Sequence, residues 1–236
     1  MLFLSRQNFL FYLVLLLTIV LSWPIFSLII LSFGNSDNLW SHLFETVLFK
    51  YIANTLILMI GTTIGTLFFG VTTAWIVTNY NFKLKSICDF ILILPAACPA
   101  YLVAYAYTDF FEYAGPVQKY LREIANWNSA NEYYFPEIRS LGGAIFVLSS
   151  VLYPYVYILC RTSFRLTPQS LKEINKIYGH NDFWNLSLPL ARPAIVVGIA
   201  LVCMEVVSDF GTVEFFSIET LTLGIFNVWI GMNNIT

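Results

Sequence analysis

The sequence has little charge. Of its 236 residues only 11% are Asp, Glu, Lys or Arg, whereas 58% are hydrophobic and the mean hydropathy is +0.72. Ordinary soluble domains carry about 25% charged residues, and a soluble fold of this size does not hide so much apolar surface in one core. The composition therefore excludes an ordinary soluble protein and indicates that lipid covers part of the surface.

Residues for catalysis or metal binding are also scarce. The two histidines, His42 and His180, are isolated in loops, and no basic patch of the kind that neutralises nucleic-acid phosphates is present. The four cysteines lie in apolar runs without metal-ligand spacing, at Cys88, Cys98, Cys160 and Cys203. No glycine-rich phosphate loop occurs, so any ATP must bind to another subunit. We expect no catalytic site, no metal site, no cofactor and no nucleic-acid partner.

Five apolar stretches are long enough to cross a bilayer, which takes about 20 helical residues. They cover residues 9–33, 52–78, 86–108, 141–163 and 194–215. The first is too long for the apolar region of a signal peptide. A further run, 221–230, stops before it could span. The sequence predicts one all-α, polytopic transmembrane bundle over 1–236, with about five complete spans and a truncated sixth, as in a fragment.

The basic residues predict the orientation of these spans. With a cytoplasmic N-terminus, eight Lys and Arg residues lie inside and four outside, as the positive-inside rule favours. The eight are Arg6, Lys83, Lys85, Arg161, Arg165, Lys172, Lys176 and Arg192. This places the loop 164–192 in the cytoplasm and the loop 109–140, with a short helix near 117–125, outside.

The second stretch carries Gly61 and Gly65 in GxxxG spacing. Small residues at this spacing let helices approach closely in lipid. They indicate either a contact between subunits or packing within one bundle, and we favour packing within the bundle.

The cytoplasmic loop has the pattern of a short amphipathic helix. Thr167 is suited to its N-cap, Pro168 to its first turn and Gly179 to a left-handed C-cap. Its apolar residues form one stripe, made of Leu171, Ile174, Ile177 and Tyr178. Such a helix on the cytoplasmic face is suited to dock in a groove of a partner protein.

This loop resembles the "EAA" loop of binding-protein-dependent ABC importers, which runs Glu-Ala-Ala, three residues, Gly and later Leu-Pro. Glu173, Gly179 and Leu188-Pro189 match the pattern, whereas Ile174 and Asn175 stand in place of the two alanines. The segment after Gly179 is three residues shorter than the family pattern. The resemblance implies that these residues dock on a cytoplasmic ABC ATPase dimer.

Two further segments, 94–118 and 165–227, resemble the ferric-iron permeases of this group. Thiamine-type permeases are built similarly, so thiamine or another small solute stays an alternative. The resemblance implies an ATP-driven importer of ferric iron in a bacterial inner membrane. It also implies an extracytoplasmic iron-binding protein and a second permease half, this chain being the first half of a fused two-half permease.

Several residues are candidates for a translocation path or gate. Glu205 and Asp209 are four positions apart, and hence expected on one helix face, near the outer end of the fifth stretch. Intramembrane carboxylates usually face a pathway or a partner. Solvation at the outer interface is the alternative. Pro95 and Pro99 interrupt the third stretch, so they either line a cavity or only bend the helix. Asp89 is expected to be interfacial.

Tyrosines are concentrated in the outer half of the chain. Their phenolate oxygens suit ferric iron, but tyrosines also collect at membrane interfaces, and we favour the interfacial role. They are Tyr101, Tyr105, Tyr107, Tyr113, Tyr120, Tyr133 and Tyr134. A rival hypothesis is an ion-coupled secondary transporter that uses Glu205 and Asp209 as ion sites. The match in the cytoplasmic loop favours the ATP-driven importer.

Overall fold

The computed structural model describes residues 2–31, 33, 39–127 and 129–231. All regular structure in these residues is helical and no strand occurs among them, which confirms the all-α prediction. The chain divides into two compact units. One comprises Met1–Val47 with Ile225–Thr236, and the other is Leu48–Gly224.

The first unit begins with helix α1 (Leu2–Leu31), followed by α2 (Leu39–Thr46). Residues Asn8–Leu31 of α1 are long and apolar enough to cross a membrane.

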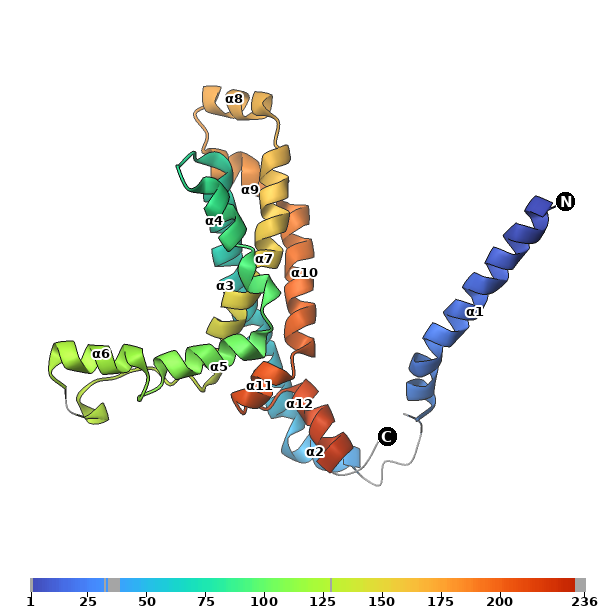
Figure 1. The fold of residues 1–236 in the computed structure, drawn as a ribbon, viewed down its shortest axis with the longest axis horizontal. Helices are drawn as coiled ribbons and strands as arrows, with labels where there is room; N and C mark the ends of the chain where they lie inside the picture. Colours follow the sequence, from blue (N-terminus) through green and yellow to red (C-terminus); the bar gives the residue numbers. More distant parts are fainter. Residues whose placement is uncertain (1, 32, 34–38, 128, 232–236) are drawn as a thin grey trace. The chain divides into compact units, whose positions relative to one another are not determined.

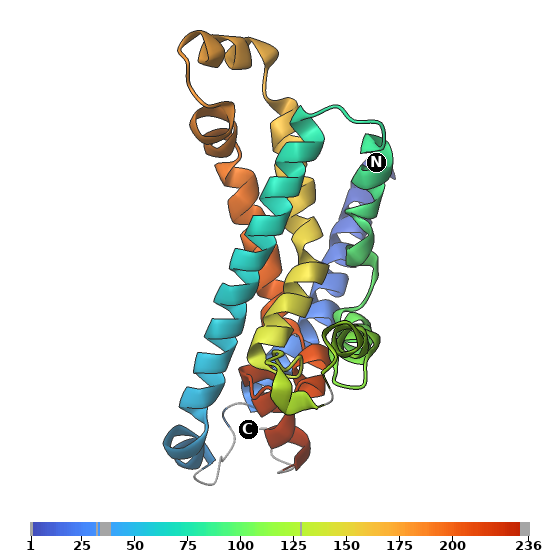
Figure 2. The ribbon, with the colours of Figure 1, turned by 90° about the vertical axis from the view of Figure 1, so that its left-hand side faces the viewer.

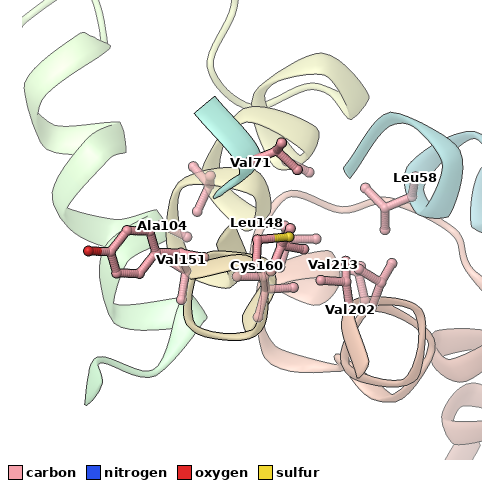
Figure 3. Close-up of a cluster of buried hydrophobic side chains, with 14 of the residues drawn as sticks. Leu58, Val71, Ala104, Leu148, Val151, Cys160, Val202 and Val213 are labelled. Atoms are coloured by element: carbon pink, nitrogen blue, oxygen red, sulfur yellow. The ribbon is translucent and has the colours of Figure 1, made fainter. Parts of the chain in front are cut away.

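The core of the second unit consists of three long helices, α3 (Leu48–Asn79), α7 (Leu141–Leu166) and α10 (Arg192–Ser208), packed lengthwise (Figures 1 and 2). Aliphatic side chains fill the space between them, among them Leu58, Leu148 and Val202 (Figure 3). Because lipid tails are as apolar as these side chains, close packing rather than transfer from water holds such helices together.

Glycines on α3 permit this close packing. A Cβ atom added at Gly61 would lie 2.6 Å from Ile145 Cδ1, and one at Gly70 would lie 2.7 Å from Val156 Cβ. Gly65 likewise faces Ser149. All three neighbours belong to α7, so the GxxxG pair packs within this chain, as favoured from the sequence.

The predicted third span is broken. It consists of α4 (Lys85–Ile91), a 3-10 turn η1 (Leu94–Ala97) and α5 (Ala100–Phe111), which continues into α6 (Pro116–Ala125). The two parts meet at 103°. Pro95 and Pro99 cause the break, because proline lacks the amide N–H and restricts the residue before it. Helix α6 confirms the short helix predicted in the outer loop, where a 3-10 turn, η2 (Ala130–Glu132), follows.

The loop 164–192, predicted to be cytoplasmic, contains α8 (Gln169–Ile177), a π-helix η3 (Asp182–Ser187) and the single turn α9 (Leu188–Leu190). The segment Asp182–Leu190 then bends by 64° into α10. Figure 1 shows α8 at one end of the bundle, and α5 and α6 at the other end, nearly perpendicular to the long helices.

The predicted fifth span is shorter than expected, because α10 ends at Ser208 and Asp209 is extended. Three short elements follow, α11 (Gly211–Phe215), α12 (Leu221–Phe226) and the π-helix η4 (Asn227–Gly231). In the described residues three helices are long and apolar enough to cross a membrane, or up to five if each bent pair forms one span.

Candidate functional site

Helix α8 begins one residue later than the sequence suggested. Thr167 ends α7 rather than capping α8, and its hydroxyl donates to the Ser163 carbonyl at 3.3 Å. Pro168 occupies the N-cap position of α8 without a side-chain capping bond. Proline disfavours the α conformation in the residue before it, so Thr167-Pro168 separates α7 from α8.

The apolar stripe of α8 faces away from the rest of the chain. Ile177 is 82% exposed and Ile174 50%, and Glu173 is exposed beside them. Leu171 and Tyr178 extend the same stripe and are also exposed. An exposed apolar stripe rimmed by polar residues is typical of a surface that binds a partner protein.

Gly179 ends α8 in the left-handed conformation that the sequence predicted, with φ +68°. Its N–H donates to the Lys176 carbonyl at 3.0 Å, and the His180 N–H to the Asn175 carbonyl at 3.1 Å. Since L-residues other than Gly and Asn rarely adopt this backbone region, glycine fixes where the chain leaves α8.

Asn175, which stands in place of a family alanine, holds the segment that follows α8 against the end of that helix. Its side-chain amide donates to Asp182 Oδ1 at 2.7 Å and to the His180 carbonyl at 3.2 Å. The Asn181 side chain then accepts from the backbone N–H groups of Phe183 and Trp184 and caps η3. Leu188 packs against the bundle core beyond η3, and Pro189 lies in α9.

Two contacts tie this loop to α3. Lys172 Nζ donates to Asn79 Oδ1 at 3.0 Å, at the end of α3. The Trp75 ring packs edge-on against Phe183 of η3 and Phe164 of α7, with centroid distances of 5.1 and 5.5 Å. These contacts link the loop that carries α8 to α3, and Trp75 also links α3 to α7.

A charged network joins α4 to α7 near the same end. The Tyr157 hydroxyl donates to Asp89 Oδ1 at 2.5 Å, Arg161 forms an ion pair with Asp89, and Arg165 lies 3.2 Å from its Oδ2. The Asp89 side chain is only 16% exposed, because it pairs with α7. The spacing of Tyr157, Arg161 and Arg165, four residues apart on one helix face, is the signal that could have predicted an acidic partner.

The four predicted pathway residues belong to two segments, the C-terminal end of α10 and the break between α4 and α5. Glu205 Oε1 accepts from the Tyr155 hydroxyl of α7 at 3.4 Å. Asp209 lies beyond the end of α10, so the expectation that it shares a helix face with Glu205 is wrong. Its Oδ1 accepts from the Thr212 hydroxyl at 3.2 Å. Its Oδ2 is buried and finds no hydrogen-bond partner among the described residues. Pro95 and Pro99 lie at the break between α4 and α5.

Tight contacts join α11, the short helix that follows α10, to α5. A Cβ atom at Gly211 would lie 3.1 Å from Tyr101 Cβ, and the rings of Tyr105 and Phe215 are 4.1 Å apart. The break at Pro95 and Pro99 therefore brings α5 against the segment that carries Asp209. These tyrosines pack on aromatic and backbone neighbours, and no group of three or more His, Cys, Asp or Glu able to hold a metal occurs in the described part of the chain.

A hollow of about 830 Å³ lies between residues 111–118 and 133–140. Glu112, Gln118 and Arg139 contribute polar groups to its wall. None of the predicted pathway residues is among the residues that line it, so the sequence did not point to it.

A protein-family model described as "Binding-protein-dependent transport system inner membrane component" matches residues 66–227. A crystal structure of a bacterial alginate ABC transporter, in complex with an alginate pentasaccharide-bound periplasmic protein, has the same fold. Its TM-score is 0.74 at 17% identity, over 98% of this chain and 86% of that chain.

Among curated proteins, the chain is 23% identical over 82% of its length to the Fe(3+)-transport system permease protein FbpB 2 of Haemophilus influenzae. It is 25% identical over 74% of its length to a probable sulfate transport system permease protein cysT of Chlorokybus atmophyticus. A probable cysT protein of Marchantia polymorpha is 22% identical over 83% of the chain. The chain spans 34%, 59% and 66% of these three relatives.

Proposed function

Because the chain belongs to the family of binding-protein-dependent transport system inner membrane components, we propose that it is the permease subunit of an ATP-driven importer. Its fold is that of an ABC transporter permease, and such subunits are not themselves enzymes. ATP is bound and hydrolysed in a separate cytoplasmic ABC ATPase dimer. The observation that carries the proposal is α8, a short helix with an exposed apolar stripe at one end of the bundle.

In this mechanism α8 docks in a groove of the ATPase through Ile174 and Ile177, with Glu173 at the rim. When ATP closes the dimer, α8 moves as a rigid body, because Gly179 and the bonds of Asn175 fix its geometry. The Lys172–Asn79 hydrogen bond passes this displacement to α3. The bundle then alternates between outward-open and inward-open states.

The far end of the bundle supplies the gate in this proposal. Broken helices line substrate paths because their freed backbone groups need protein or water partners, and Pro95 and Pro99 produce such a break. Glu205 and Asp209 place two carboxyl groups near the junction of α10 and α11. The Oδ2 of Asp209 is buried without a hydrogen-bond partner among the described residues, so in this proposal it becomes an acceptor for a cation only in a conformation that opens this end of the bundle.

We propose ferric iron as the transported ion. The residues 94–118 and 209–216 resemble ferric-iron permeases, and one relative is an Fe(3+)-transport permease. Carboxyl groups favour a cation over a sulfate anion on electrostatic grounds. Sulfate is the second candidate, because relatives of similar identity are probable sulfate permeases. The remaining partners proposed are an extracytoplasmic iron-binding protein and a second permease half, fused or separate.

Uptake into cells tests the proposal and separates the two substrates. Labelled ferric iron and labelled sulfate are supplied to cells with the gene, without it, and with Asp209→Asn, which keeps the side-chain size. We expect deletion to abolish ATP-dependent iron uptake alone, and Asp209→Asn to reduce it. Loss of sulfate uptake with normal iron uptake would support the importer function but identify sulfate, and not ferric iron, as the substrate. Unchanged uptake of every solute tested would contradict the importer itself.

A further inference from the structure

Helix α6 exposes its apolar face and turns a polar face toward the chain, whereas a surface helix of a water-soluble protein does the reverse. Its apolar residues Val117, Tyr120, Leu121 and Ile124 repeat at i, i+3, i+4 and i+7 and so share one face. Tyr120 is 64% exposed and Ile124 62%, whereas the polar Gln118 is only 7% exposed. The apolar face therefore points away from the chain and a polar face points toward it.

The polar face of α6 is held by hydrogen bonds. Gln118 donates to the Phe111 carbonyl at 2.7 Å and accepts from the Tyr133 hydroxyl at 2.6 Å. Arg122 donates to the Tyr113 carbonyl at 2.9 Å and to Tyr133 at 3.0 Å. This network fixes the rotation of α6 about its axis, so its apolar face stays outward.

The position of α6 relative to the bundle follows from two further contacts. An ion pair of 2.7 Å joins Glu112, between α5 and α6, to Arg139, two residues before α7 begins. The α5–α6 segment also turns by 103° from the preceding helix and runs across the end of the long helices (Figure 1). If α3 and α7 cross the bilayer, α6 lies at its surface and in its plane.

We propose that α6 lies in the lipid interface opposite the α8 loop, with Tyr120, Leu121 and Ile124 inserted among the lipids. Continuity supports lipid as the occupant, because α5 also exposes Leu102 and Phe110 along the same segment. The composition agrees, since Tyr120 and Trp127 are residue types enriched at membrane interfaces. Lys119 and Glu123 have opposite charges and both are exposed, so the helix needs no anionic lipid.

Fluorescence quenching tests this placement. The four native cysteines of the full chain are replaced by serine, and one environment-sensitive label is attached at Ile124→Cys. The matched control carries the label at Lys119→Cys, five positions away on the polar side of the same helix. Both are measured in phosphatidylcholine nanodiscs. We expect the Ile124→Cys label to emit at shorter wavelength and to lose intensity with doxyl-labelled lipid. The Lys119→Cys label should lose intensity with aqueous iodide. Tyr120→Cys and Glu123→Cys provide a second pair in case one variant does not fold.

Two results would overturn the proposal. Equal quenching of both labels by iodide would place the apolar face of α6 in water. Shielding of the Ile124→Cys label from both iodide and doxyl lipid would show that protein, such as a second permease subunit, covers this face instead.

Discussion

At the scale of single residues, a substitution at Gly179 tests the backbone conformation alone, because a new side chain there would not disturb any packing. Its φ is +68°, and a Cβ atom there would meet nothing within 4 Å. A left-handed backbone costs an L-residue about 1–2 kcal/mol, least for Asn. We predict that Gly179→Val lowers ATP-dependent uptake while the amount of protein in the membrane stays the same. Gly179→Asn should retain uptake, and equal loss in both variants would count against the assigned role of the left-handed C-cap.

Asp89 gives a second prediction at this scale. It is the carboxylate that Tyr157, Arg161 and Arg165 share. Asp89 and Arg161 are mostly shielded, with side chains 16% and 19% exposed. Removing one partner of a fully buried ion pair costs about 3–5 kcal/mol, so that range is an upper bound here. We expect Asp89→Ala to lower the free energy of unfolding by at most that amount, measured by thermal unfolding in detergent.

The matched control for Asp89 is Arg165→Ala, whose side chain is 49% exposed. Exposed ion pairs contribute about 0–1 kcal/mol, so this variant should unfold close to the temperature of the parent. A parent-like unfolding temperature for Asp89→Ala as well would show that the network does not hold α4 to α7.

At the scale of elements, the contact between α3 and α7 depends on small residues. Gly70 has the Val156 side chain 2.7 Å from the position of an added Cβ. Overpacking of this kind costs about 1–3 kcal/mol. We predict that Gly70→Ile reduces the fraction of monodisperse protein in size-exclusion chromatography. Gly142→Ala, where the nearest atom is 3.8 Å away, should leave that fraction unchanged, and a similar elution profile for both would contradict the packing argument.

The long helices α3 and α7 could be predicted from sequence to within a few residues of each end, because each is one uninterrupted apolar run. Helix α8 and the left-handed conformation of Gly179 could be predicted because Pro168 and Gly179 act locally. The direction of the chain after Pro95 and Pro99 could not be predicted from sequence, because proline breaks a helix without determining where the next helix packs. The pairing of Asp89 with α7 joins distant segments of the chain. The outward apolar face of α6 depends on side-chain hydrogen bonds to residues just outside the helix. Hydrophobic periodicity contains neither kind of contact.

At the scale of the molecule, the Leu48–Gly224 unit has two ends with different surfaces. At one end α8 exposes an apolar stripe and is tied to α3 by Lys172. At the other end α5 and α11 pack around the break that follows Pro95. The long helices α3 and α7 connect the two ends. In the proposed mechanism they carry a displacement of α8 to the proposed gate at the opposite end.

The central claim, that α8 docks on an ABC ATPase, is tested most directly by site-specific crosslinking in membranes that contain the ATPase. A photoreactive residue replaces Ile177 on the exposed stripe of α8, and the same residue replaces Lys119 at the opposite end of the bundle as control. The account predicts a crosslink to the ATPase from position 177 whose yield changes when ATP is added, and none from position 119. No crosslink from position 177, or equal yields from both positions, would contradict it.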